Sequence, residues 1–267
     1  MAASVEQLAE FISQFECLVH RLSRHFERPT FVEVNGHPEF RHMERNDLLL
    51  SFLKCVRAAS SLNASVVLLR SGYVQEVGAL CRCVDEFCED VLFLATPLGE
   101  NGTYSTDQNR LVEEFYQEEF PEDPGPLMQP QARNRVPRDK VRAGIARIDG
   151  MPINRHDATQ LHRALGRTFS GYVHGAYVHI MEMYGGPSLE QCRYHTSGML
   201  GTPRIEQHTD LLANYVYRFA ISAEVVARRC EDGEVITELE AARLRFEQAT
   251  GFGAGDANAL LDKAKRR

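Results

Sequence analysis

The fold is decided by residues 46–95, which have the sequence NDLLLSFLKCVRAASSLNASVVLLRSGYVQEVGALCRCVDEFCEDVLFLA. Asn46 is a good helix N-cap, so a first helix is predicted over 46–70. Gly72 then interrupts the pattern, and a second helix is predicted over 73–95. The segment therefore forms either a helical hairpin or one helix sharply kinked at Gly72.

Further helices are predicted on both sides of this segment. Apolar residues at three- and four-residue spacing predict an amphipathic helix over 4–28, stopped by Pro29. We expect 29–45 to be a loop, and we find no strand alternation and no internal repeat. The other helices are predicted, in chain order, over 106–119, 139–150, 156–183, 211–225 and 235–249.

These elements predict a single all-α domain over 1–267, built as an antiparallel helical bundle. The chain has 267 residues and is 43% hydrophobic, which is enough for one large core. Prolines are frequent over 121–137, so we expect a flexible insertion or lid over about 98–137. The core is placed at about 46–183, with a helical extension over 203–250.

Composition excludes several functional classes. A net charge of -7 argues against a general nucleic-acid coat or an anionic-membrane binder, although it leaves room for a local basic groove. Seven cysteines without a CxxC pair are typical of reduced core thiols in a cytoplasmic protein. We expect no signal peptide and no membrane span, because polar residues interrupt the most apolar stretch, 48–69.

The strongest functional signal is the pair Arg167 and His174, seven residues apart in a predicted helix. They share one face with Arg163 and Ser170, and we call these four residues the Arg/His stripe. A permanent cation beside a proton carrier suits chemistry on a phosphodiester. A histidine among apolar helix residues is, however, more often a packed core or interface residue than a catalyst. Tyr172 is expected on a different face, as a packing residue or hydrogen-bond donor.

Glycines make this predicted helix costly. Gly166, Gly171 and Gly175 each cost about 1 kcal/mol relative to alanine in a helix interior. We therefore expect another helix or a partner backbone to approach this face closely. A close neighbour would explain the glycines whether or not a phosphate binds there.

Arg82 and Glu86 form the second candidate constellation, at i and i+4 of the second helix of the hairpin. They are either a solvated salt bridge or a buried pair that braces the Arg/His stripe. We expect no metal site, because the ExxH at Glu39 lacks the partners of a di-iron bundle and the other histidines lack zinc spacing. No phosphate-binding glycine loop is found and no cofactor is expected.

The segment 66–86 resembles the first helix pair of the HEPN superfamily, with a leucine-rich helix, a Gly-Tyr turn and a helix ending in glutamate. The Arg167 and His174 spacing is similar to that superfamily's RNase motif, an arginine and histidine separated by four to six residues. The chain also resembles a sparsely characterised family of bacterial helical proteins that pair such a hairpin with an element like Ser170 to Gly175.

The HEPN resemblance implies a metal-independent endoribonuclease, often a toxin of a toxin–antitoxin pair or an antiviral defence effector, whose active site forms across a homodimer. It implies His174 as general acid or base and Arg167 as the group that stabilises the phosphorane charge. Arg163, Ser170, Tyr172, Arg82 and Glu86 would support them. The resemblance implies equally well a non-catalytic module that binds a protein partner or small ligand in the same cleft.

Overall fold

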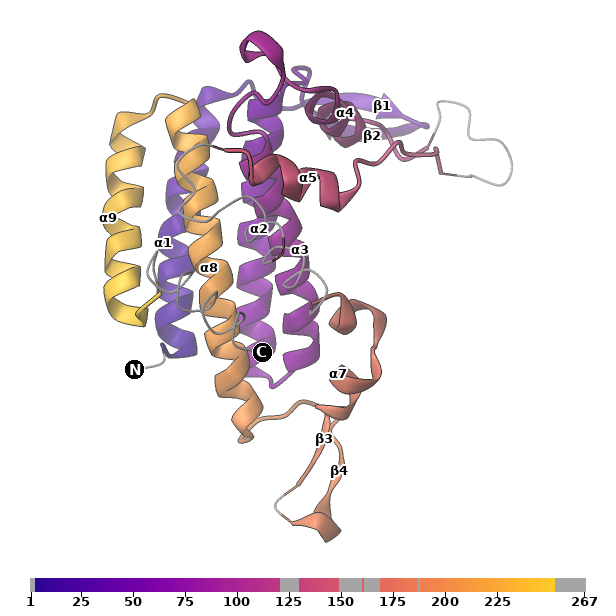
Figure 1. Cartoon of the computed structure of the whole chain (residues 1–267), viewed down its shortest axis with the longest axis vertical. Coiled ribbons are helices and arrows are strands. Elements are labelled where there is room, and N and C mark those ends of the chain that lie inside the picture. Colours follow the sequence, from indigo (N-terminus) through magenta and orange to yellow (C-terminus); the bar gives the residue numbers. More distant parts are fainter. Residues whose placement is uncertain (1–2, 121–129, 149–159, 161–168, 187, 253–267) are drawn as a thin grey trace.

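The computed structural model describes residues 3–120, 130–148, 160, 169–186 and 188–252. Its long helices run side by side as a packed bundle, with smaller elements at both ends (Figure 1). The bundle helices are α1 (Val5–Leu22), α2 (Asp47–Arg70), α3 (Val74–Phe93), α8 (Pro203–Arg229) and α9 (Gly233–Thr250). The expectation of a mostly helical bundle is confirmed.

The turn between α2 and α3 is a tight hairpin and not a kink. The Asn46 side chain accepts a hydrogen bond from the Leu49 N–H at 2.8 Å, so α2 begins where the sequence predicts. Gly72 has φ of +83° and lies against the backbone of Met199, so that a Cβ there would stand 2.6 Å from the Met199 nitrogen. The turn is therefore also the point where the chain after α7 is anchored to the bundle.

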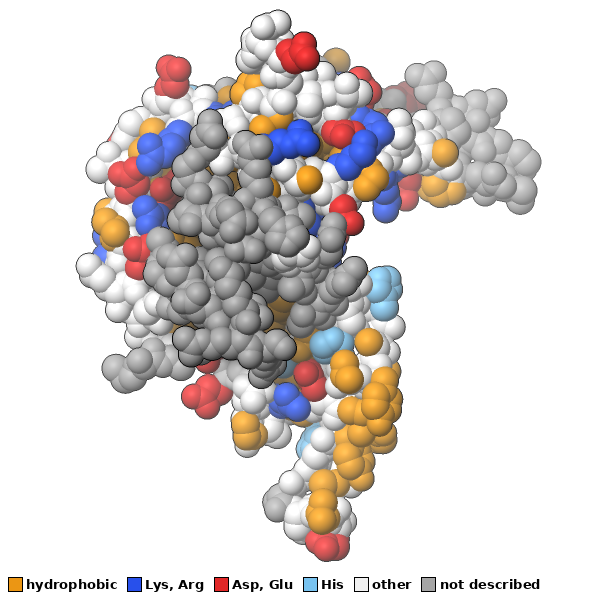
Figure 2. Space-filling model, in the orientation of Figure 1, with side chains coloured by type: hydrophobic (Ala, Val, Ile, Leu, Met, Phe, Trp, Pro, Cys, Tyr) orange, Lys and Arg blue, Asp and Glu red, His pale blue; other side chains and the backbone are white. Residues whose placement is uncertain are grey.

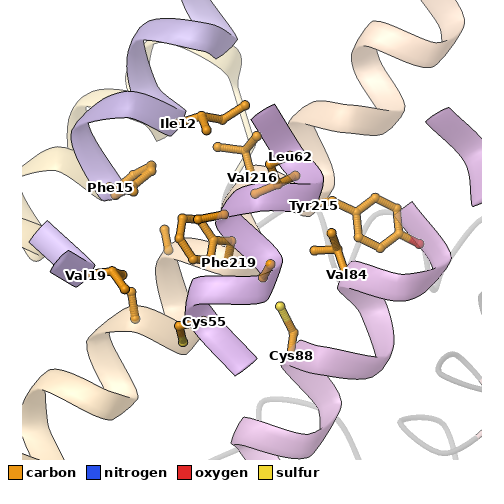
Figure 3. Close-up of a cluster of buried hydrophobic side chains, with 14 of the residues drawn as sticks. Ile12, Phe15, Val19, Cys55, Leu62, Val84, Cys88, Tyr215, Val216 and Phe219 are labelled. Atoms are coloured by element: carbon orange, nitrogen blue, oxygen red, sulfur yellow. The ribbon is translucent and has the colours of Figure 1, made fainter. Parts of the chain in front are cut away.

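The core fills the space between the bundle helices. Figure 3 shows side chains from α1, α2, α3 and α8 meeting there, and the Phe15 and Phe219 rings pack edge to face at 6.4 Å. By length and composition α2 is the one described helix apolar enough to cross a membrane, contrary to the expectation from its interrupting polar residues. Most of its apolar residues are buried, although Val67 is exposed, and Ser65 donates its hydroxyl to the Ser61 carbonyl at 2.8 Å.

Two small hairpins correct the expectation that the chain has no strands. The first, predicted as a loop, pairs β1 (Thr30–Val34) with β2 (His37–Arg41) through a turn at Asn35 and Gly36. The second pairs β3 (Tyr184–Gly185) with β4 (Arg193–Tyr194). Asn-Gly is the preferred two-residue hairpin turn, and this signal was present in the sequence.

The short helices differ from their predicted bounds. They are α4 (Thr106–Phe115), α5 (Arg138–Ile145) and α7 (Tyr177–Met181), with 3₁₀ turns at Ser23–His25, Glu100–Gly102 and Leu189–Gln191. The proposed insertion over 98–137 thus contains α4, and its residues 121–129 lie outside the described part. The single helix expected over 156–183 is wrong within its described part, because Gly175, at φ +60°, separates helical residues 169–174 from α7.

Candidate functional site

The Arg/His stripe is described only in part. Arg163 and Arg167 lie outside the described residues, as does Gly166, so their positions stay predictions. Ser170 and His174 lie on the helical segment 169–174, where Ser170 is half-buried and His174 is exposed. Within the described part of the chain His174 makes no hydrogen bond or ion pair.

The segment 169–174 is held against the bundle by two aromatic rings. Phe169 is buried and meets the Tyr215 ring of α8 edge to face at 5.3 Å. Tyr172 packs on α3 at Gly78, where a Cβ would stand 2.5 Å from the ring. Each residue advances an α-helix by about 100°, so His174, two residues after Tyr172, is directed to the opposite face of the helix. Its imidazole is therefore available to solvent and to a ligand.

The close neighbour expected at the glycines is found at Gly171. A Cβ on Gly171 would lie 2.1 Å from the His179 ring, so only glycine admits the imidazole there. We expected another helix or a partner backbone at this face, whereas the neighbour is the His179 side chain of α7. Gly175 has a different role, because its positive φ ends the helical segment and lets α7 fold back.

Glu182 lies at the centre of a polar cluster that the sequence did not reveal. Its carboxylate accepts hydrogen bonds from the Tyr172 hydroxyl at 3.0 Å and from the Gln75 amide at 3.2 Å. His179 Nδ1 and an Arg204 nitrogen lie 3.9 and 3.8 Å from its other oxygen. Burial, and then the Glu182 carboxylate, raise the pKa of Tyr172, so that its hydroxyl is a donor at neutral pH. The cluster joins α3, α7 and α8.

His208 lies beside this cluster and is 3% exposed. Its Nδ1 bonds to the Arg204 carbonyl at 2.9 Å, whereas its buried Nε2 has no partner among the described residues. Burial lowers the pKa of His208, so the folded protein holds it neutral where the unfolded chain would bind a proton.

This burial predicts acid sensitivity. The unfolded pKa is near 6.5, so the contribution of neutral His208 is complete above that pH and is lost as the pH falls below it. Each pKa unit of difference corresponds to about 1.4 kcal/mol. We expect the free energy of unfolding, measured by urea denaturation, to fall more for the wild type than for His208→Gln when the pH is lowered from about 7.5 to about 5.5. An equal loss in both proteins would contradict this prediction, and His37→Gln, at an exposed site, is the control.

Arg82 and Glu86 form the predicted ion pair, with 2.5 Å between nitrogen and oxygen. The Arg82 side chain is 14% exposed and that of Glu86 is 40% exposed, so the pair is neither fully solvated nor fully buried. Arg82 also faces Asp85 at 3.5 Å. Its ionic partners among the described residues are on α3 itself, so a brace between this pair and the Arg/His stripe stays a prediction.

Buried charges continue along α3. Asp85 lies 2.9 Å from a nitrogen of Arg218 on α8, and the fully buried Glu89 bonds to Arg142 and Arg138 of α5 at 2.8 and 2.9 Å. These carboxylates follow one another in the DEFCED run and resemble a solvated helix face in sequence. These partners on α8 and α5 are 49 or more residues away in sequence, so no local signal identified them. Among the described residues, no group of three or more His, Cys, Asp or Glu side chains is placed to hold a metal ion.

Comparison with protein-family models, with curated proteins and with solved structures finds no match.

Proposed function

We propose that the protein is a HEPN-like, metal-independent endoribonuclease that uses Arg167 and His174. The observation that carries the proposal is the exposure of His174 on the helix face directed away from α3 and α8. A histidine that only completed a core would be buried, whereas a general acid or base must reach its substrate.

The chemistry follows from the two side chains. His174 would take the proton of the ribose 2′-hydroxyl as that oxygen attacks the neighbouring phosphorus, or would protonate the leaving 5′-oxygen. Arg167 would stabilise the charge on the phosphorane through its guanidinium. The products would carry a 2′,3′-cyclic phosphate and a 5′-hydroxyl. This reaction requires no cofactor.

An exposed apolar surface supports the homodimer in this proposal. Val173, Tyr177, Val178 and Ile180 surround the end of the helical segment that carries His174, and the Tyr177 side chain is 77% exposed. Figure 2 shows hydrophobic side chains gathered over α7 and the β3–β4 hairpin. Contiguous exposed apolar surface marks interaction sites, and a second copy on this face would bring two His174 side chains close together.

The dimer is tested at Val178. We expect light scattering to give twice the chain mass for the wild type and a monomer mass for Val178→Asp, because an unpaired carboxylate in an apolar interface is costly. Leu244→Asp makes the same apolar-to-acidic change at an exposed leucine of α9 and should leave the dimer intact. A monomeric wild type, or a dimeric Val178→Asp protein, would contradict the assignment of this surface.

The nuclease is tested with purified protein and total RNA in excess EDTA. We expect cleavage with cyclic-phosphate ends, and loss of cleavage in Arg167→Ala. RNA left intact by the wild type under several buffer conditions would overturn the proposal.

A second function, a non-catalytic module that binds a protein partner or small ligand, is favoured by one observation. Catalytic histidines are usually oriented by a hydrogen-bond partner, and His174 has none among the described residues. The RNA experiment separates the two functions, because a binding module leaves RNA intact while keeping its exposed apolar surface.

A further inference from the structure

A cleft of about 620 Å³ lies where α2, α3 and α4 meet the chain that enters α5. We call it the α5 cleft. Its charged wall carries the cations Lys54, Arg133, Arg135 and Arg138. Figure 2 shows Lys and Arg side chains gathered over α4 and α5. Three carboxylates, Glu86, Asp90 and Glu114, line the cleft as well, so four cations face three carboxylates in a chain whose net charge is -7.

The deep cations of the α5 cleft are occupied by its own carboxylates. Asp90 lies 2.9 Å from Lys54 Nζ and 2.6 Å from a nitrogen of Arg138. Arg138 also bonds to Glu89. These contacts fix the floor of the cleft and leave little charge there for a ligand.

The outer cations are different. Arg135 is 77% exposed, and its Nε lies 3.6 Å from Glu114, beyond hydrogen-bond distance. Arg133 is exposed and makes no ion pair in the described part of the chain. Glu86, the remaining carboxylate of the cleft, is already paired with Arg82. The rim therefore presents two exposed arginines, of which Arg135 has Glu114 as a 3.6 Å ionic neighbour and Arg133 has no ion-pair partner among the described residues, and their guanidinium donors can bind an anion.

An apolar wall stands beside these arginines. Leu111, Phe115 and Val136 line the α5 cleft, and Lys54 Nζ lies 5.4 Å from the centre of the Phe115 ring. Cations that follow a backbone, combined with an aromatic surface for bases, are the features of single-stranded nucleic-acid sites.

The α5 cleft and the His174 segment lie along the same helix. Gly78, on which Tyr172 packs, and Glu86, which lines the cleft, are eight residues apart on α3, about 80° apart around the helix axis, and so lie on adjacent faces. At 1.5 Å per residue they are separated by about 12 Å along the helix. Figure 2 shows the surface hollowed between the α5 region and the α7 region. One oligonucleotide can span both places.

We propose that the α5 cleft binds the phosphodiester backbone of single-stranded RNA through Arg133 and Arg135, with a base against the Phe115 wall. This inference rests on the proposed function, because it names where that substrate is held outside the reacting phosphate.

The test is fluorescence anisotropy with a labelled single-stranded RNA, in EDTA, on the His174→Ala background so that the RNA stays whole. We expect R133E with R135E to raise Kd at least about tenfold and to reduce the slope of log K against log salt by about 1.4, or about 0.7 per lost phosphate contact. R245E is the control at an exposed arginine of α9, and it should change Kd less than about twofold. Circular dichroism checks that both proteins keep their helices.

Two results would overturn the inference: no RNA binding by the His174→Ala protein, or equal Kd values for the cleft variant and R245E. The failures remain distinguishable. If the wild type cleaves RNA while the cleft variant binds and cleaves like the control, the nuclease stands and the α5 cleft does not. If RNA binds through the α5 cleft but the wild type never cleaves it, the cleft stands and the nuclease fails.

Discussion

Glu89→Ala is expected to lower the free energy of unfolding by about 3 to 5 kcal/mol. Glu89 is fully buried on α3 and accepts hydrogen bonds from Arg142 and Arg138 of α5. Arg138 keeps its second partner, Asp90, but Arg142 is 5% exposed and would remain in the interior without its counter-ion. The uncompensated guanidinium is the main cause of the loss.

Urea denaturation at neutral pH measures this effect. Glu86→Ala is the matched control, because it removes a carboxylate of the same helix whose ion pair is partly exposed, and it should cost less than about 1 kcal/mol. Glu89→Gln keeps the side-chain shape, and its loss in free energy of unfolding should lie between those of Glu89→Ala and Glu86→Ala. A Glu89→Ala protein as stable as Glu86→Ala would show that the α3 to α5 charges are not coupled as described.

His174→Ala is expected to slow RNA cleavage by about 10² to 10⁴-fold, the usual contribution of a general acid or base. Its effect on stability should be small, because His174 is exposed and the bundle contacts of its segment come from Phe169 and Tyr172. The two effects therefore separate. A large drop in melting temperature with His174→Ala would mean that the imidazole is a packing residue.

The helices of the bundle were predictable because their signals are local. The N-cap at Asn46 and the glycine at position 72 mark where α2 begins and where the chain turns, although they leave a hairpin and a kinked helix equally open. The β1–β2 hairpin was missed because its strands have only five residues each and lie mostly exposed, which weakens the apolar alternation. Its Asn35-Gly36 turn was the available signal.

The candidate site was less predictable because its contacts join distant segments. Tyr172, Gln75 and Arg204 come from three elements and meet only at Glu182, which no spacing rule links to them. The same holds for Glu89 and its partner Arg142, which are 53 residues apart. The glycines beside the Arg/His stripe did predict crowding at Gly171, although not that His179 causes it.

The most direct test of the central claim is the single-turnover cleavage of a labelled RNA in EDTA by three proteins in parallel. They are the wild type, His174→Ala and His37→Ala, the last at an exposed histidine of β2. We predict that the wild type and His37→Ala cleave at equal rates and leave 2′,3′-cyclic phosphates, and that His174→Ala leaves the RNA whole. Cleavage by His174→Ala at the wild-type rate, or intact RNA with all three proteins, would contradict the account.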